Sequence, residues 1–348
     1  MNVELPRLFP RRKPEGFTPA VQRWSARFPS GCTALHVGFF AVQIPAASGG
    51  GTFAADAAYD TWRQQAFGGP HAPISVDHAS YQDDAGALNR VTAAYWTDSA
   101  AFMAWCHSPE LGGWWSQAER ENADAGYWRE MLTVPLERLE TLYWSDYPAA
   151  LSKALPVDPA TYSGYFGAMR DRIALAAIDP LDGAAALPPA RPVEARRRYL
   201  VVPPHNLAMI RSASYWGRCD AEQQADYEQK LRDPLAQGMD YLRSHPSESG
   251  CCSLRFQRTE DATGQLQPET HALAYFLSLG DLERWAEGHA SHKVIFDAAI
   301  ARYQKYGAQN QLRTWHEVFV LPREGQHFEY INCHCATGLL PFFDRIAL

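Results

Sequence analysis

Two histidines three residues apart, His289 and His292, lie in a stretch whose apolar residues recur at steps of three and four. This spacing predicts one face of a helix over 281–303, with both histidines on its inward side. A buried histidine needs a polar partner, and an ordinary hydrogen bond in the core is its common fate. The alternative is an axial ligand to haem iron, since neutral imidazole binds iron and Trp285 and Phe296 would suit a flat macrocycle.

Three more polar side chains could do chemistry. His316 alternates with valines on a predicted strand over 314–321, which gives it an apolar and dry face. Ser212 lies on a predicted strand over 206–215, and Arg172 ends a Met-Arg-Asp-Arg run. Taken alone, these residues fit a core histidine, a structural serine and a surface salt-bridge run.

The cysteines restrict how haem could be held. The sequence has seven cysteines and contains neither a Cys-x-x-Cys-His motif nor a Cys-Pro pair. Covalent attachment needs the first of these motifs, and the second is typical of thiolate ligation, so histidine remains as the ligand. Cys333-His334-Cys335 lacks a second pair at a zinc-site spacing and is interpreted as structural thiols.

The elements that would position these groups alternate between strands and helices twice along the chain. In the first half we expect strands at 35–44, 89–97 and 133–143, and helices at 53–67 and 100–107. In the second half we expect strands at 199–202, 206–215, 253–258, 271–279 and 314–321, and helices at 220–243 and 281–303.

The two halves repeat one plan, in which a strand leads into a helix that carries Trp105 in one half and Trp285 in the other. We therefore predict an α+β fold, a pseudo-duplicated ferredoxin-like barrel of the dimeric α+β barrel type with its helices packed outside the sheets. Prolines between 144 and 160 mark the boundary. The predicted divisions are an extended N-terminal arm (1–30), a first ferredoxin-like half (31–155) and a second half that carries the haem site (156–348).

Composition excludes several classes of protein. The 348 residues carry a net charge of −7, and the basic clusters at 11–13 and 196–198 are short, so a nucleic-acid partner is not expected. We interpret these clusters as solvated surface or as contacts to cofactor carboxylates. No apolar run reaches the ~18–20 residues that span a bilayer, and the N-terminus does not look like a secretory signal. A cytoplasmic protein without a membrane partner is expected.

Five segments resemble the bacterial and fungal aldoxime dehydratases, in order, and the resemblance runs from about residue 30 to 340. They include a Met-Arg-Asp-Arg run and a His-x-x-His pair. The segments are 164–172, 205–212, 238–243, 283–292 and 328–334.

The resemblance implies a homodimeric lyase that binds haem b in a ferredoxin-like barrel and dehydrates a small-molecule aldoxime to a nitrile. The second histidine of the pair, His292, matches the proximal iron ligand of that family. His316 matches its distal acid/base histidine, although Trp315 stands where the family usually has tyrosine.

The resemblance also assigns the remaining site residues. Ser212 matches the serine that holds the substrate hydroxyl, Arg172 the supporting arginine, and Glu140 a glutamate in a Glu-Thr-Leu-Tyr stretch. The implied reaction places the aldoxime nitrogen on ferrous iron, while His316 delivers a proton to the leaving oxygen as general acid.

Three rival classes stay open. A peroxidase or chlorite-decomposing enzyme of similar barrel shape would turn over peroxide rather than aldoxime. A haem-binding sensor or carrier would bind haem and show no activity on any aldoxime. A barrel protein without a cofactor would be colourless.

Overall fold

One large antiparallel sheet dominates the computed structural model, which describes residues 5–46, 50–194 and 197–348. The first four residues of the predicted arm and Arg196 of the second basic cluster lie outside these ranges. The order of the sheet is β14-β8-β13-β5-β2-β4-β3-β10-β11-β9-β12-β6, and every pairing between neighbours is antiparallel. A mixed α+β fold is confirmed.

The first set of elements runs strand, helix, two strands, helix and strand. Its members are β2 (Ala34–Ile44), α1 (Gly50–Ala66), β3 (Ser75–Gln82), β4 (Leu88–Trp96), α2 (Ser99–His107) and β5 (Gly126–Pro135), with the short α3 (Ala118–Glu121) before β5. Within the sheet these strands lie in the order β5-β2-β4-β3.

The second set repeats the arrangement with helices in pairs. Its members are β9 (Leu207–Tyr215), α5 (Ala221–Lys230), α6 (Arg232–Ser244), α7 (Pro246–Ser249), β10 (Cys251–Glu260), β11 (Leu266–Phe276), α8 (Leu279–Gly288), α9 (Ala290–Tyr306) and β12 (Arg313–Leu321). These strands lie in the order β12-β9-β11-β10, which corresponds strand for strand to the first set.

Strands outside the two sets extend the sheet at both ends. β6 (Leu139–Leu142) follows the first set in the chain but pairs with β12 of the second. β8 (Arg198–Val202), β13 (Gln326–Ile331) and β14 (Asp344–Ala347) come from the other half of the chain, and β13 pairs with β5. A separate two-stranded sheet joins β1 (Trp24–Ala26) to β7 (Val157–Pro159).

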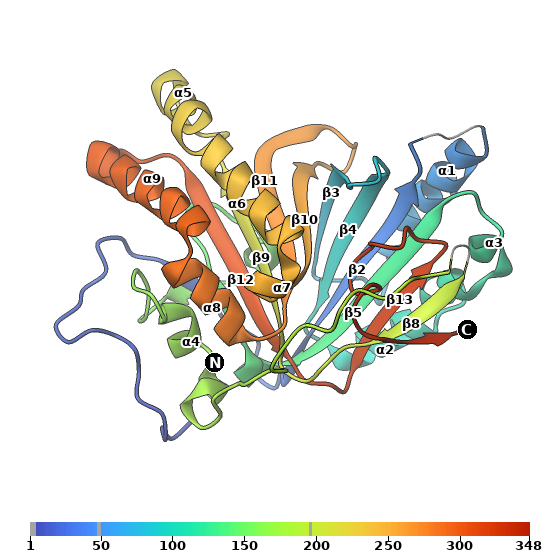
Figure 1. The fold of residues 1–348 in the computed structure, drawn as a ribbon, viewed down its shortest axis with the longest axis horizontal. Coiled ribbons are helices and arrows are strands. Elements are labelled where there is room, and N and C mark those ends of the chain that lie inside the picture. Colours follow the sequence, from blue (N-terminus) through green and yellow to red (C-terminus); the bar gives the residue numbers. More distant parts are fainter. Residues whose placement is uncertain (1–4, 47–49, 195–196) are drawn as a thin grey trace.

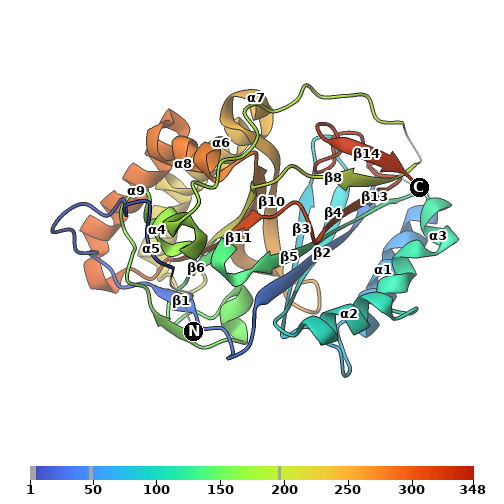
Figure 2. The ribbon, with the colours of Figure 1, turned by 90° about the horizontal axis from the view of Figure 1, so that it is seen from below.

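The sheet has a core on each side. Its two halves face each other across an inner core that includes Val37 from β2 and Phe319 from β12 (Figures 1 and 2). On the outer surface, α1 and α2 cover one half, and α6 and α8 cover the other, where Trp285 packs with Val318. None of the helices in the described ranges is long and apolar enough to cross a membrane.

Three predictions from the sequence are wrong. The expected helix over 281–303 is two helices, because His289 adopts an extended conformation and caps the start of α9. The expected strand over 133–143 is broken after Pro135 by a short 3₁₀ turn, and its second part becomes β6. The expected helix over 220–243 is also two helices, because a break at Leu231 separates α5 from α6, and Pro234 lies in the first turn of α6.

Candidate active site

Ser212 and His316 are direct partners on the neighbouring strands β9 and β12. Their side chains therefore leave the same face of the sheet, and this face is the one that carries Val318 and packs against α6 and α8. Both side chains are only partly buried, and that of His316 is 25% exposed. The sequence led us to expect a dry environment for His316, and the structure leaves it open instead.

Glu140 and Arg172 meet His316 on this face. Glu140 of β6 lies opposite Val318, two residues from His316 along the neighbouring strand. Arg172 ends the short helix α4 (Ala168–Arg172), and its Nε donates to Glu140 Oε2 at 2.7 Å. A second guanidinium nitrogen of Arg172 lies 3.0 Å from His316 Nε2, and the third donates to the Tyr162 carbonyl at 2.7 Å.

The Nε2 atom of His316 thus has a donor and an acceptor within reach. It lies 3.0 Å from the Arg172 guanidinium and 3.0 Å from Glu140 Oε1. A bare Nε2 can accept from Arg172, and a protonated Nε2 can donate to Glu140. Glu140 Oε1 is buried without a hydrogen bond in the described ranges, so it is the atom left to receive that proton donor.

The charges at this site favour an ionised Glu140. Burial alone would raise the pKa of Glu140, but the charges of Arg172 and His316 outweigh burial and hold the pKa at about 2. At neutral pH the site therefore contains a buried carboxylate against a guanidinium, and this carboxylate can stabilise a positive charge on His316.

The structure separates the two histidines of the His-x-x-His pair. His289 Nδ1 lies 2.9 Å from Ser291 Oγ and accepts from the Ser291 amide, and the His289 ring stacks on Tyr241 at 3.9 Å. His292 begins α9 with its ring edge-on to Trp285 at 4.7 Å. The two rings do not share one helical stripe, which corrects the prediction that both face inward from one helix.

His292 has the properties of a metal ligand. Its Nδ1 is buried and makes no hydrogen bond to any residue in the described ranges. Burial lowers the pKa of His292, and the Ala286 carbonyl only partly opposes this effect, so the ring is neutral. Neutral imidazole is the form that binds iron.

The surroundings of His292 fit haem. Phe296 and Ile300 follow it by one and two turns of α9, and they are 38% and 40% exposed. α8 and α9 lie along the outer side of β12, the strand that carries His316 (Figure 1). A flat apolar macrocycle bound at His292 would cover these exposed side chains. The residues present therefore fit the cofactor.

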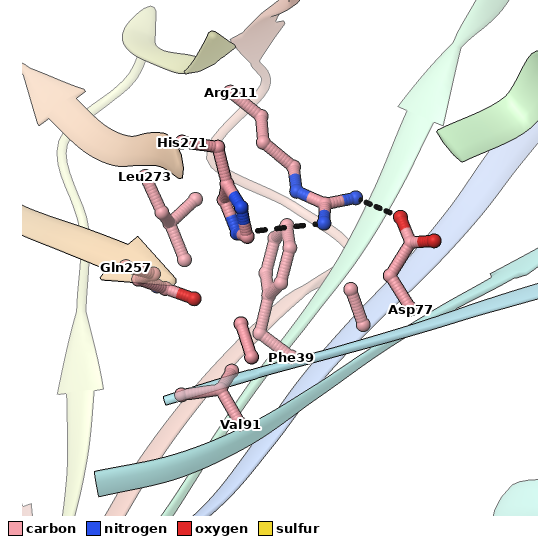
Figure 3. Close-up of a pocket in the computed structure, with 9 residues that line it drawn as sticks. Phe39, Asp77, Val91, Arg211, Gln257, His271 and Leu273 are labelled. Carbon is pink, nitrogen blue, oxygen red and sulfur yellow. Dashed lines mark hydrogen bonds and ion pairs between the residues drawn. The ribbon is translucent and has the colours of Figure 1, made fainter. Parts of the chain in front are cut away.

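A charged network lies directly behind the site, and the sequence predictions did not include it. Arg211 and Glu317, the chain neighbours of Ser212 and His316, are cross-strand partners on the inner face. Arg211 donates to Asp77 Oδ2 at 2.6 Å, beside a small cavity of about 10 Å³ that His271 also lines (Figure 3). Burial, then the Arg211 charge, lowers the pKa of His271 far below its usual value, so this histidine is neutral. The sequence signal was the alternation of charged residues with Ser212 and His316.

A model of haem-containing dehydratases matches residues 39–339, and the chain belongs to this family. It is 30% identical to a phenylacetaldoxime dehydratase from Bacillus sp. (strain OxB-1), over 96% of this chain and 95% of the relative. It is 32% identical to an aliphatic aldoxime dehydratase from Pseudomonas chlororaphis, over 97% and 96%.

Solved structures agree with these relatives. The chain superimposes on a crystal structure of an aldoxime dehydratase with a TM-score of 0.87 and 31% identity, over 97% of this chain and 95% of the other. A second aldoxime dehydratase, crystallised with butyraldoxime, gives a TM-score of 0.87 and 28% identity over 97% and 93%.

Proposed function

We propose that this protein dehydrates aldoximes to nitriles at a ferrous haem b, with His316 as general acid and base. The observation that carries the proposal is the position of His316 Nε2, which lies 3.0 Å from both Arg172 and Glu140. Ser212, on the neighbouring strand β9, is the direct cross-strand partner of His316. The similarity to phenylacetaldoxime and aliphatic aldoxime dehydratases supports the substrate class.

His316 carries the proton cycle. In the protonated ring, Nε2–H donates to the buried Glu140 Oε1, which leaves Nδ1–H to donate to the aldoxime oxygen. Proton transfer to this oxygen lets the N–O bond break with water, rather than hydroxide, as the leaving group. The bare Nδ1 then takes the carbon-bound proton as the C≡N bond forms, and His316 returns to its starting state.

Glu140 stabilises the imidazolium and fixes which nitrogen faces the substrate, as the carboxylate does in a serine-protease triad. Arg172 keeps Glu140 ionised, and its positive charge lies where negative charge develops on the leaving oxygen. Ser212, directly opposite His316, orients the aldoxime hydroxyl. These three residues prepare the proton transfer without exchanging protons themselves.

His292 would hold the haem through its imidazole, whose Nδ1 makes no hydrogen bond to the residues that the structure describes. When bound, the haem supplies a ferrous centre that can take the aldoxime nitrogen and donate electron density toward the N–O bond. Trp285 packs edge-on against the ring and restricts its rotation.

The proposal also covers the division of the chain, the oligomeric state and the cellular location. We infer two ferredoxin-like halves, 31–155 and 156–348, after an arm over 1–30, because both sets of strands follow the same order in the sheet. We also infer a homodimer, as the resemblance to the family implies, and we expect it to work in the cytoplasm. Light scattering on the purified protein would measure the oligomeric state.

The proposal is tested with the purified protein loaded with haem. Dithionite-reduced protein is titrated with one aliphatic and one aryl aldoxime while the Soret band is followed, and nitrile is measured by gas chromatography. We expect a spectral change on binding and nitrile formation only in the reduced sample. Nitrile formation at the full rate without reductant contradicts the ferrous requirement, and haem binding without nitrile favours a carrier.

A further inference from the structure

The short helix α4 connects the two sides of the proposed haem site. Arg172 at its end contacts Glu140 and His316. Two residues earlier, Arg170 donates to both carboxylate oxygens of Glu283 on α8, at distances between 2.8 and 3.1 Å. α8 leads directly into α9 and His292, so α4 touches the distal group at one end and the proximal helices at the other.

A second contact joins the same segments. Phe166, just before α4, packs against Phe296 of α9 with ring centroids 5.0 Å apart. Glu283 is buried although it is charged, and Arg170 also donates to the Pro180 carbonyl. A buried carboxylate is tolerated only when it is paired, and here it is paired across two helices.

The N-terminal arm contacts both α4 and α8. Arg12 lies 3.3 Å from Glu283, and the backbone amides of Arg12 and Lys13 donate to the buried carboxylate of Asp171. Tyr165 donates its hydroxyl to the same carboxylate at 2.7 Å. Asp171 is the chain neighbour of Arg172, so the arm is tied directly beside the residue that contacts His316.

The arm passes so close to α4 that only glycine fits beneath it. A Cβ atom at Gly167 would lie 2.6 Å from the Arg12 side chain, and the Gly167 φ angle of +90° is itself unfavourable for other residues. α4 has five residues, which is too few for a helix to be stable alone. The position of Arg172 therefore depends on these tertiary contacts.

We propose that Glu283 and Asp171 are positioning residues. They join the arm, α4 and α8 into a clasp that holds Arg172 against Glu140 and His316 and keeps the helix before His292 at the spacing that haem requires. This inference rests on the proposed function. Neither residue touches the reacting atoms, and both act through Arg172 and the haem.

The test uses the full-length protein loaded with haem and the variant Glu283→Gln, which keeps the shape and removes the charge. Replacing a residue that supports a metal ligand or a site residue typically lowers metal affinity or activity by ~10–100-fold. We expect haem to transfer to an excess of apomyoglobin at least ~10-fold faster than from the wild type. We also expect the C–O stretching frequency of the ferrous carbonyl complex to shift toward that of Arg172→Gln, because this frequency responds to positive charge near the bound gas.

The matched control is Arg284→Gln, on the same helix. It removes the ion pair that the exposed Arg284 side chain makes with Asp281 within α8. We expect the control to keep the haem-transfer rate within about twofold of the wild type, since exposed ion pairs contribute little. If Glu283→Gln behaves like this control in both measurements, the clasp is wrong even when the wild type forms nitrile.

A second variant covers the case in which Glu283→Gln does not fold. Arg7 of the N-terminal arm lies 3.9 Å from the Asp171 carboxylate. Replacing Arg7 and Arg12 together by Gln removes only the partly exposed ion pairs of the clasp. We expect the same direction of change in both measurements, with haem transfer at least ~3-fold faster, and unchanged values overturn the proposal. A wild type that binds haem and forms no nitrile instead refutes the proposed function.

Discussion

Ser212 of β9 and His316 of β12 lie directly opposite each other. Their chain neighbours Arg211 and Glu317 form the next cross-strand pair, whose side chains lie on the other face of the sheet. One face thus carries the proposed hydroxyl anchor and proton donor, and the other carries buried charges. Because side chains alternate along a strand, the register that aligns one pair also aligns the other.

Removing the proposed iron ligand should remove haem. His292→Ala leaves no imidazole at this end of α9, and we expect the Soret band to be lost after reconstitution and desalting. His289→Asn is the matched control, because asparagine can still cap α9 and the ring of His289 is already engaged with Tyr241. A normal Soret band in His292→Ala would rule out this ligand assignment.

His316→Ala should separate binding from chemistry. We expect haem content and the spectral change with aldoxime to remain, because neither needs the proton donor. Turnover should fall at least ~100-fold, the low end for loss of a general acid. Steady-state nitrile formation and the optical titration measure the two effects, and a loss below about tenfold would assign the proton to another group.

Arg172→Lys tests whether the planar guanidinium matters beyond its charge. Arg172 reaches Glu140, Tyr162 and His316 with three different nitrogens, and one ammonium group cannot reproduce this geometry. We expect kcat to fall by ~10–100-fold while the haem spectrum stays close to the wild type. Equal kcat values for the two proteins would show that charge alone is sufficient.

Acid should destabilise the protein partly through Glu140. Its folded pKa of about 2 lies below the ordinary value of 4.5, so its ionised form stabilises the fold above about pH 4.5 and this stabilisation is lost as the pH falls toward 2. This pKa shift contributes on the order of 3 kcal/mol to the free energy of unfolding at neutral pH. In urea unfolding, Glu140→Gln should be less stable than the wild type near pH 7, and the difference should shrink near pH 3.

The control for this measurement is Glu287→Gln, which changes an exposed carboxylate on α8. Its free energy of unfolding should differ little from that of the wild type at both pH values. A Glu140→Gln difference that does not depend on pH would mean that the carboxylate is not ionised through its pairing with Arg172.

Local patterns predicted β2, β4 and the five strands from β8 to β12, but not β1, β3, β7, β13 or β14. The expected strands at 35–44 and 206–215 differ from β2 and β9 by one residue at their starts, because their burial pattern is visible in the sequence. β3 was missed, since its polar residues Asp77 and His78 hide the alternation. The helix over 281–303 was wrong because apolar residues continue at helical spacing through the break at His289, whose side chain caps α9 instead of continuing α8.

The site was less predictable than the strands. The resemblance to aldoxime dehydratases implied Glu140, Arg172, Ser212 and His316 as a set. No local pattern could place Glu140 of β6 opposite Val318 of β12, which lies 178 positions further along the chain. The contact between Arg170 and Glu283 also joins distant segments, 113 positions apart, and a salt-bridge run on the surface was the ordinary interpretation. Pairings of this kind depend on the global fold, which hydrophobic periodicity does not encode.

The exchange of outer strands between the two halves affects how the molecule could be divided. β6 completes the sheet built mostly from later residues, and β13 completes the sheet built mostly from earlier ones. Two polypeptides produced by cutting the loop near residue 185 would each lack a strand that only the other can supply, and each would expose an unpaired sheet edge. Each piece would leave open an edge, at β12 or at β5, that the other piece covers in the intact chain.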